Sequence, residues 1–221
     1  MRIFYPPALR YGVQFVARQR RNPFGMSPPC ERFVPGCGDT GADFHAVGDH
    51  PGIHGGAESR VPFTDKPWSE TFFRTLERAD LVRDVDGSDA PLGRTFFSYL
   101  CMCVTDGTPT ADDYAAMEPF FDAELRAITA HVLVPVGERA TAHVLRNYTA
   151  RASTDFDMEA LHGTELRGSG WLVVPVKEPA EWGDDDADAL ADGLVELQST
   201  DYRRVSDLGR FFPGDDPYLV R

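Results

Sequence analysis

The sequence predicts an α/β fold: a three-layer α/β/α sandwich around a four-stranded, mainly parallel sheet. Four short runs of apolar, β-branched and aromatic residues have the composition of strands buried on both faces, at 44–47, 96–104, 132–136 and 171–176. Helical patterns separate these runs, and strands that alternate with helices form a parallel sheet covered on both sides. At 221 residues the chain is long enough for one domain with a substantial core.

The first predicted strand leads into a loop rich in glycine and proline, whose sequence at 48–56 is Gly-Asp-His-Pro-Gly-Ile-His-Gly-Gly. In open α/β sheets, ligands bind at the carboxyl ends of the strands, which is where this loop begins. Its glycines let backbone N–H groups approach an anion, while Asp49 and His50 add groups that can move protons or stabilise charge. The alternative interpretation is a tight turn that carries two surface histidines.

Helices are predicted between the strands, at 66–79 after the loop and at 138–146 after the third strand. The helix between the second and third strands has its apolar residues at helical spacing: Tyr114, Met117, Phe121, Leu125 and Ile128. Thr110 and Asp113 form a start like a capping box for this helix, and we expect Pro119 to kink it.

The folded domain is expected to span 26–200. Residues 1–25 combine arginines with apolar residues but lack the continuous apolar stretch and cleavage site of a signal peptide. This segment is not interpreted as a signal. From position alone, we expect it to be a disordered extension, with Met26 as the natural start. A last amphipathic helix begins at the acidic triplet 184–186, whose charge suits a helix N-terminus. The tail, 201–221, is expected to dock on the domain.

The chain is strongly acidic, with a formal net charge of -13, and only Lys66 and Lys177 are lysines. A surface rich in Asp and poor in Lys is typical of a halophilic protein, because carboxylates hold hydration in a high-salt cytoplasm. The alternative is an acidic protein that avoids nucleic acid. Composition by itself favours that alternative, since nonspecific DNA affinity is largely phosphate electrostatics. No run of eighteen apolar residues occurs, so we expect no membrane span and a cytoplasmic location.

The four cysteines, Cys30, Cys37, Cys101 and Cys103, form no recognisable disulfide framework. Cys101 and Cys103 lie close together in a predicted strand, among buried apolar residues. We interpret both cysteines as small buried core residues and not as joint ligands of a metal.

The glycine-rich loop resembles the first motif of the uracil-DNA glycosylase superfamily, Gly-x-x-Pro-Gly. In the fourth and fifth families of that superfamily a glycine-rich or His-Gly segment follows, and then Pro-Phe-(Val or Thr)-Gly. This chain has the corresponding residues at 48–52, 54–56 and 62–64, in the same order and spacing. Later segments also resemble the family, namely 95–104, 109–113, 132–140 and 173–180. The resemblance covers roughly 30–182, and it rests on the order of the motifs together.

The resemblance implies the same α/β/α sandwich and a DNA glycosylase that flips a deaminated or damaged base out of the helix and hydrolyses its N-glycosidic bond. It places Asp49 where the fourth family has an acid that orients water or stabilises the cationic sugar. A loop cap is the alternative for this residue. Phe63 matches the aromatic that stacks on the base. The rest of the loop would line the base site: Gly48, His50, Pro51, Gly52 and His54.

Two positions depart from the family pattern. Ser98 and Tyr99 stand near the position of an asparagine that often reads the uracil edge, so the recognition of the base differs. Glu178 stands where the family has the histidine that stabilises the departing uracil anion, and a carboxylate there opposes that charge. Lys177 compensates if its ammonium turns inward. Otherwise Glu178, protonated in a dry pocket, donates to a different base, or it forms a salt bridge on a changed loop.

Some relatives in these families hold an iron-sulfur cluster with four cysteines. Cys30 and Cys103 match two of those positions, but Ser27 and Met117 stand at the other two. The resemblance therefore implies no cluster here, unless Cys37 substitutes, and no other cofactor or metal.

Three functions remain open at this stage. The first is a monomeric DNA glycosylase acting on DNA that contains a damaged or deaminated base. The second is a relative that binds nucleic acid or a nucleotide and has lost catalysis, which Glu178 and the acidic surface favour. The third is a hydrolase of free nucleosides or nucleotides, since the same pocket could hold one without a duplex.

Overall fold

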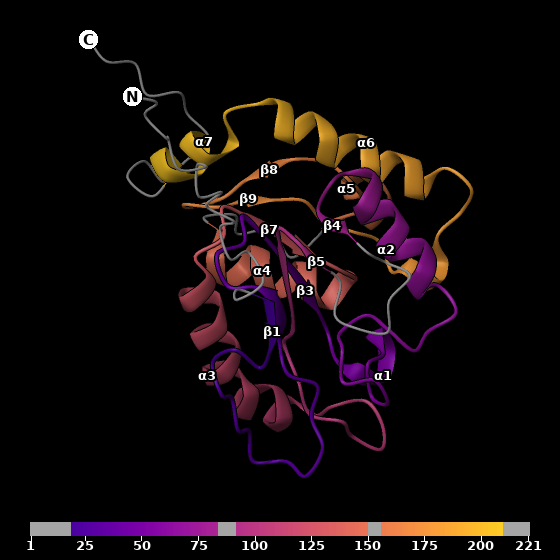
Figure 1. Ribbon diagram of the computed structural model, residues 1–221, viewed down its shortest axis with the longest axis vertical. Helices are drawn as coiled ribbons and strands as arrows, with labels where there is room; N and C mark the ends of the chain where they lie inside the picture. The colour runs from indigo at the N-terminus through magenta and orange to yellow at the C-terminus, as the bar shows by residue number, and fades with distance from the viewer. Residues whose placement is uncertain (1–18, 84–91, 150–155, 210–221) are drawn as a thin grey trace, which may run out of the picture.

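The computed structural model describes residues 19–83, 92–149 and 156–209. It has the predicted α/β architecture: a sheet of seven strands lies between two layers of helices (Figure 1). The order of strands in the sheet is β1-β2-β6-β3-β7-β9-β8. In chain order these are β1 (Gln19–Arg21), β2 (Cys37–Asp39), β3 (Phe44–Gly48), β6 (Thr95–Tyr99), β7 (Val132–Pro135), β8 (Leu166–Arg167) and β9 (Leu172–Val173). A separate hairpin consists of β4 (Val82–Arg83) and β5 (Leu92–Gly93).

The four strands predicted from the sequence are the parallel centre of this sheet. β6, β3, β7 and β9 pair in parallel, and the short strands β1, β2 and β8 extend the sheet at its edges by antiparallel pairing. Beyond β9 the chain stays hydrogen-bonded to its neighbour, because the Val176 N–H donates to the Pro135 carbonyl at 2.9 Å. All four parallel strands therefore end at one edge of the sheet, where their connecting loops gather.

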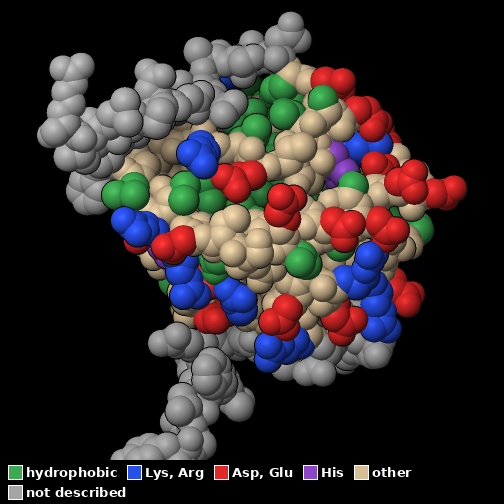
Figure 2. Space-filling view, turned by 90° about the horizontal axis from the view of Figure 1, so that it is seen from above, with side chains coloured by type: hydrophobic (Ala, Val, Ile, Leu, Met, Phe, Trp, Pro, Cys, Tyr) green, Lys and Arg blue, Asp and Glu red, His purple; other side chains and the backbone are tan. Residues whose placement is uncertain are grey.

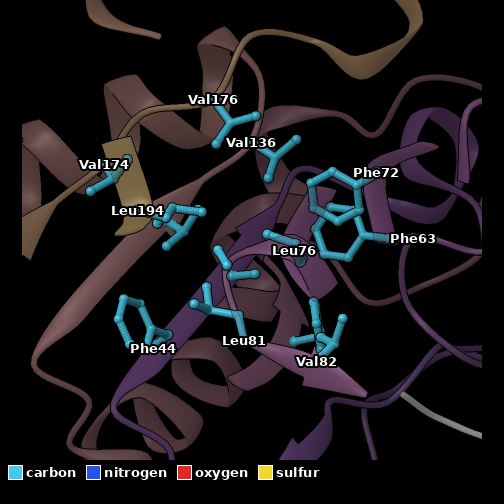
Figure 3. Close-up of a cluster of buried hydrophobic side chains, with 14 of the residues drawn as sticks. Phe44, Phe63, Phe72, Leu76, Leu81, Val82, Val136, Val174, Val176 and Leu194 are labelled. Atoms are coloured by element: carbon cyan, nitrogen blue, oxygen red, sulfur yellow. The ribbon is translucent and has the colours of Figure 1, made fainter. Parts of the chain in front are cut away.

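The helices fall into two layers. Their bounds are α1 (Pro51–His54), α2 (Ser69–Arg78), α3 (Ala111–Ile128), α4 (Glu138–Tyr148), α5 (Met158–Leu161), α6 (Asp186–Ser199) and α7 (Tyr202–Gly209), with a 3₁₀ turn at Pro179–Glu181. The apolar residues of α2 and α6 pack with one face of the sheet, and Figure 1 shows these two helices side by side. Those of α3 and α4 pack with the other face. Figure 3 shows the first of these cores, in which Phe63, Phe72 and Leu76 lie close together. None of the described helices is both long and apolar enough to span a membrane.

Several local expectations agree with the structure. The capping box of α3 is present, because the Thr110 side chain accepts from the Asp113 N–H while the Asp113 carboxylate accepts from the Thr110 N–H. Pro119 lies inside α3, which continues to Ile128, and the kink expected there stays a prediction. The part of the tail that the structure describes docks as α7, whose Tyr202 is buried. Residues 210–221 lie outside the described residues.

The N-terminal boundary differs from the expectation. β1 lies within the extension predicted for 1–25, and it pairs with β2, so the ordered part of the chain begins before Met26. The Asn22 side chain also accepts the Met26 N–H, which ties this segment to the domain. Residues 1–18 lie outside the described residues, so the disorder expected there stays a prediction.

The cysteine expectation was wrong for Cys103. Strand β6 ends at Tyr99 rather than continuing to residue 104, because the chain turns away after Cys101, whose N–H still donates to the Asp49 carbonyl. Cys103 then lies beside the N-terminal segment and forms a disulfide with Cys30. These are the two cysteines that match cluster positions, and they are joined to each other. Cys101 and Cys37 are free and buried, as expected of core cysteines.

The acidic surface carries both signs of charge. Figure 2 shows acidic and basic side chains interspersed across one face of the molecule. Among the described residues, the Asp43 carboxylate forms ion pairs with both Arg94 and Arg203. The Tyr202 hydroxyl donates to the same carboxylate at 3.1 Å. This cluster fixes α7 against the amino-terminal end of β3.

We expect the Cys30–Cys103 disulfide to stabilise the fold by about 4 kcal/mol, because it closes a loop between residues separated by 73 positions. The Cys30→Ser/Cys103→Ser double variant should unfold at a lower denaturant concentration than the oxidised wild type. The wild type under reducing conditions should match the variant. Equal midpoints for the oxidised wild type and the variant would contradict this assignment.

Glu124 makes the stability depend on pH. Its carboxyl is fully buried against Gly36, and burial raises its pKa from 4.5 to about 8, although the Gly36 N–H acts in the opposite direction. The folded state therefore keeps the proton to a higher pH than the unfolded state. The stability contributed by this group is complete below the unfolded pKa and is lost as the pH rises towards the folded pKa, by about 1.4 kcal/mol per pH unit.

Chemical denaturation between about pH 5 and pH 8 measures this loss. The slope should disappear in Glu124→Gln, which keeps the shape of the side chain but cannot ionise. Glu118→Gln, an exposed position on the same helix, is the matched control and should keep the wild-type slope. A wild-type slope in Glu124→Gln would show that another group is responsible.

Candidate active site

A cleft of about 1090 Å³ opens at the edge of the sheet where the parallel strands end. Its floor comes from the residues that follow β3, β7 and β9, including Asp49, Gly137 and Glu178, and its walls come largely from α3 and α4. The chain passes from β3 to β6 on one side and later places β7 on the other side. The cleft therefore lies at a topological switch point, where open α/β sheets bind their ligands.

Asp49 lies at the floor of this cleft with its carboxylate held from two sides. Its Oδ1 accepts a hydrogen bond from the Tyr114 hydroxyl at 2.5 Å, and its Oδ2 lies 3.5 Å from Nε of Arg139. The Arg139 guanidinium also lies over the Tyr114 ring, 4.7 Å from its centroid. Burial, and then the hydrogen bond to Asp49, raises the pKa of Tyr114, so this hydroxyl remains a donor. The carboxylate is thereby fixed in orientation and partly compensated by one cation.

A second pair of groups lies beside Asp49. The His54 ring is fully buried, its Nδ1 accepts the backbone N–H of Asp49 at 2.8 Å, and its Nε2 lies 3.0 Å from Oε2 of Glu178. Because Nδ1 is an acceptor, the ring hydrogen is assigned to Nε2, which donates it to the Glu178 carboxylate. The other oxygen of Glu178, Oε1, is buried without a hydrogen-bond partner in the described part of the chain.

Gly137 allows this close approach. It precedes α4 with a φ of +82°, and a Cβ at this position would lie 3.0 Å from Oε2 of Glu178 and 3.6 Å from the His54 ring. A side chain here would therefore push the carboxylate away from the imidazole. Gly137 belongs to the segment 132–140 that resembles the family, and this close approach gives a spatial reason for a glycine at this position.

His50 acts as a local helix cap. Its Nδ1 accepts the Gly52 N–H at 3.1 Å, and Pro51 occupies the first position of α1. A Cβ at Gly52 would lie 2.6 Å from the His50 ring, so the glycine makes room for the cap. Burial lowers the pKa of His50, although the charge of Asp49 acts in the opposite direction. A neutral capping histidine stabilises the loop, and its predicted contact with a base or phosphate stays a prediction.

Three predicted base-recognition residues lie beneath the loop instead of in the cleft. Phe63, Ser98 and Tyr99 are fully buried, and none of them is among the cleft-lining residues. The Phe63 ring packs 5.0 Å from Phe72, measured between centroids, and Ser98 Oγ lies 2.7 Å from Nε2 of His45. Their predicted roles in stacking and reading a base stay predictions, and stacking on Phe63 would require neighbouring side chains to move.

Tyr99 holds the loop in place. Its hydroxyl accepts a hydrogen bond from the Phe63 N–H at 2.7 Å and donates to the His54 carbonyl at 2.9 Å. The Gly55 carbonyl also lies within hydrogen-bonding distance of this hydroxyl, at 3.1 Å. A Cβ at Gly48 would lie 2.7 Å from the Tyr99 ring, which is why the strand ends in a glycine. The residue expected to recognise a base therefore satisfies buried backbone groups.

Lys177 does not lie against the Glu178 carboxylate. Its ammonium pairs with Glu159 at 2.6 Å and with Asp186 at 3.0 Å, contacts that raise the pKa of Lys177. The compensation of Glu178 that an inward-turned lysine would supply is therefore absent from this arrangement. The group that contacts Glu178 is His54.

Tyr114 and Arg139 were missed in the sequence. Tyr114 fits the apolar periodicity of α3 and was assigned to its buried face. Arg139 did carry a signal, because it lies in the first turn of α4, where the helix dipole disfavours a cation. A basic residue at such a position indicates a nearby carboxylate, which here is Asp49.

The chain matches a known protein-family model. The model described as the uracil DNA glycosylase superfamily matches residues 35–189, which is more than half of the chain and includes every cleft residue discussed above. A search of curated proteins found no match to the sequence.

The role of Tyr99 predicts a loss of stability in Tyr99→Phe. Removing the hydroxyl leaves the buried Phe63 N–H and the His54 carbonyl without their partner, which should cost about 1–3 kcal/mol in the free energy of unfolding. Chemical denaturation measures this loss. Tyr148→Phe is the matched control, since the Tyr148 hydroxyl makes no hydrogen bond in the described part of the chain, and its stability should change little. Equal losses in both variants would argue against the loop-holding role.

Proposed function

Because the chain belongs to the uracil DNA glycosylase superfamily, we propose that it is a DNA N-glycosylase, which flips a deaminated or otherwise damaged base into the cleft and hydrolyses its bond to the sugar. Membership of this superfamily implies a DNA glycosylase-like activity and DNA as the partner. The proposal adds the mechanism and the residues. Under it, the protein acts as a monomer in the cytoplasm and needs no metal.

The observation that carries the proposal is the fixed Asp49 carboxylate at the floor of the cleft. Breaking an N-glycosidic bond leaves positive charge on the sugar, and an oriented carboxylate stabilises such a charge more effectively than water does. The same carboxylate can orient the attacking water and accept its proton. Tyr114 and Arg139 keep it in one orientation, so little reorganisation is needed when the charge develops.

The His54–Glu178 pair faces the same cleft and is proposed to contact the flipped base. The neutral imidazole keeps Glu178 in position, while Oε1 of that carboxylate has no partner among the described residues. A base that enters the cleft is proposed to meet the Glu178 carboxylate, and a hydrogen bond to the buried Oε1 would require a small movement of this side chain. The proposal assigns recognition to this pair and chemistry to Asp49.

The second candidate is a relative that binds nucleic acid without catalysis. It is supported by the nearly complete burial of Asp49 and by the partners that both of its oxygens already have. Under this second function Asp49 has a structural role, because neither of its carboxylate oxygens is free to bind and activate a water molecule. Activity of the Asp49 variant separates the two.

The proposal predicts that Asp49→Asn lowers base excision by at least about a hundredfold, the size of a lost general base. The substrates are single- and double-stranded oligonucleotides containing uracil, hypoxanthine or xanthine, together with DNA treated with a methylating agent. Abasic sites are measured as strand cleavage after alkaline treatment, at low and at high concentrations of potassium chloride.

Asp80→Asn is the matched control, because Asp80 is exposed and pairs with Arg83 outside the cleft. It should excise at the wild-type rate. Equal activity of Asp49→Asn and the wild type would remove Asp49 from the mechanism. Absence of product from every substrate, with a folded wild type that binds DNA, would favour the second candidate.

A further inference from the structure

Carboxylates outnumber cations in the cleft. Among the described residues that line it, seven are Asp or Glu and three are Lys or Arg. Arg139 and Lys177 are already paired with carboxylates, which leaves Arg146 as the basic residue of this lining without an ion pair among the described residues. A concave site with an excess of one sign of charge concentrates ligands of the opposite sign. The cleft therefore favours a cationic group over an anionic one.

Glu178 places one of these charges where a base is expected to lie. The His54 Nε2–H donates to one carboxylate oxygen of Glu178 at 3.0 Å, which fixes the position of this carboxylate in the cleft lining. The ammonium of the adjacent Lys177 is engaged by two other carboxylates. The negative charge of Glu178 is thus held by a neutral ring, and no cation pairs with it within the described residues.

The charge of the departing base decides which substrates such a site tolerates. When the C1′–N bond of a neutral base breaks, the electron pair stays on the base nitrogen and the base leaves as an anion. A carboxylate beside it raises the energy of that transition state. A purine alkylated on a ring nitrogen, such as N7 of guanine or N3 of adenine, already carries a positive charge, so the same electron pair makes it neutral. The carboxylate attracts this base before cleavage and has no anion to repel afterwards.

We propose that the substrates are N-alkylated, cationic purines in DNA, and that Glu178 selects them. This inference rests on the proposed N-glycosylase function and narrows it. The C1′–N9 bond breaks, its electron pair neutralises the purine, and the sugar cation forms beside Asp49. Water adds to C1′ and gives its proton to the Asp49 carboxylate, and then to solvent. The products are a neutral alkylpurine and an abasic site. Selection operates on kcat/KM, because the bound cation is attracted and the neutral product is not repelled.

The test compares base release by the wild type from methylated DNA and from uracil-containing DNA of matched sequence. Released 7-methylguanine, 3-methyladenine and uracil are separated by chromatography and quantified. The expected result is a kcat/KM for the methylpurines that exceeds that for uracil by at least about tenfold. Release of uracil in preference to the methylpurines would overturn the inference and leave the glycosylase function standing. Release of no base from any substrate would overturn both.

Glu178→Gln tests the role of the charge itself. The amide oxygen can still accept the His54 Nε2–H, so the shape of the floor is kept while the charge is removed. The preference for methylpurines over uracil should fall by about tenfold, through a higher KM for the methylpurines and faster release of uracil. Glu196→Gln, on the exposed surface of α6, is the matched control and should keep the wild-type preference. An unchanged preference in Glu178→Gln would show that Glu178 does not select the base.

Discussion

The structure of the site depends on one constraint: a loop buried at the end of a sheet must find partners for its backbone polar groups. The loop after β3 has little regular structure, yet both of its ends, 54–56 and 61–63, are buried. Two side chains meet this requirement. The His54 ring accepts the N–H of Asp49, and the Tyr99 hydroxyl joins the backbone of Phe63 to that of His54. Because the loop is held at both ends, the position of the Asp49 carboxylate follows from it.

The two carboxylates beside this loop, Asp49 and Glu178, have different surroundings. Asp49 contacts a cation and a hydroxyl donor, whereas the hydrogen-bond partner of the Glu178 carboxylate among the described residues is the His54 imidazole. A carboxylate fixed beside a guanidinium keeps its orientation while charge develops on a neighbouring sugar. The carboxylate of Glu178 has no cation paired with it among the described residues. His54 connects the two, since its two ring nitrogens contact Asp49 and Glu178 respectively.

Cys30 and Cys103 connect two distant segments of the chain through a disulfide. Cys30 and Cys103 are joined directly, and the packing around them includes Met26 and Met117. A covalent link between the N-terminal segment and the loop after β6 holds these two parts together. At the opposite end of β3, the ion pairs of Asp43 hold α7. Both ends of the central strand are therefore fixed by contacts between distant segments.

The sequence by itself determined the four parallel strands, the helices between them, the capping box at Thr110 and the position of Asp49 at the end of β3. These features depend on local periodicity and on short-range hydrogen bonds, which residues close in the chain specify. Tertiary structure decided the partners. Tyr114 lies 65 positions from Asp49, Cys103 lies 73 from Cys30, and Glu178 lies 124 from His54. Such pairs meet only through the order and register of the strands. The same reason explains why Phe63, Ser98 and Tyr99, which a motif places at the base site, lie under the loop, and why Lys177 turns to Asp186.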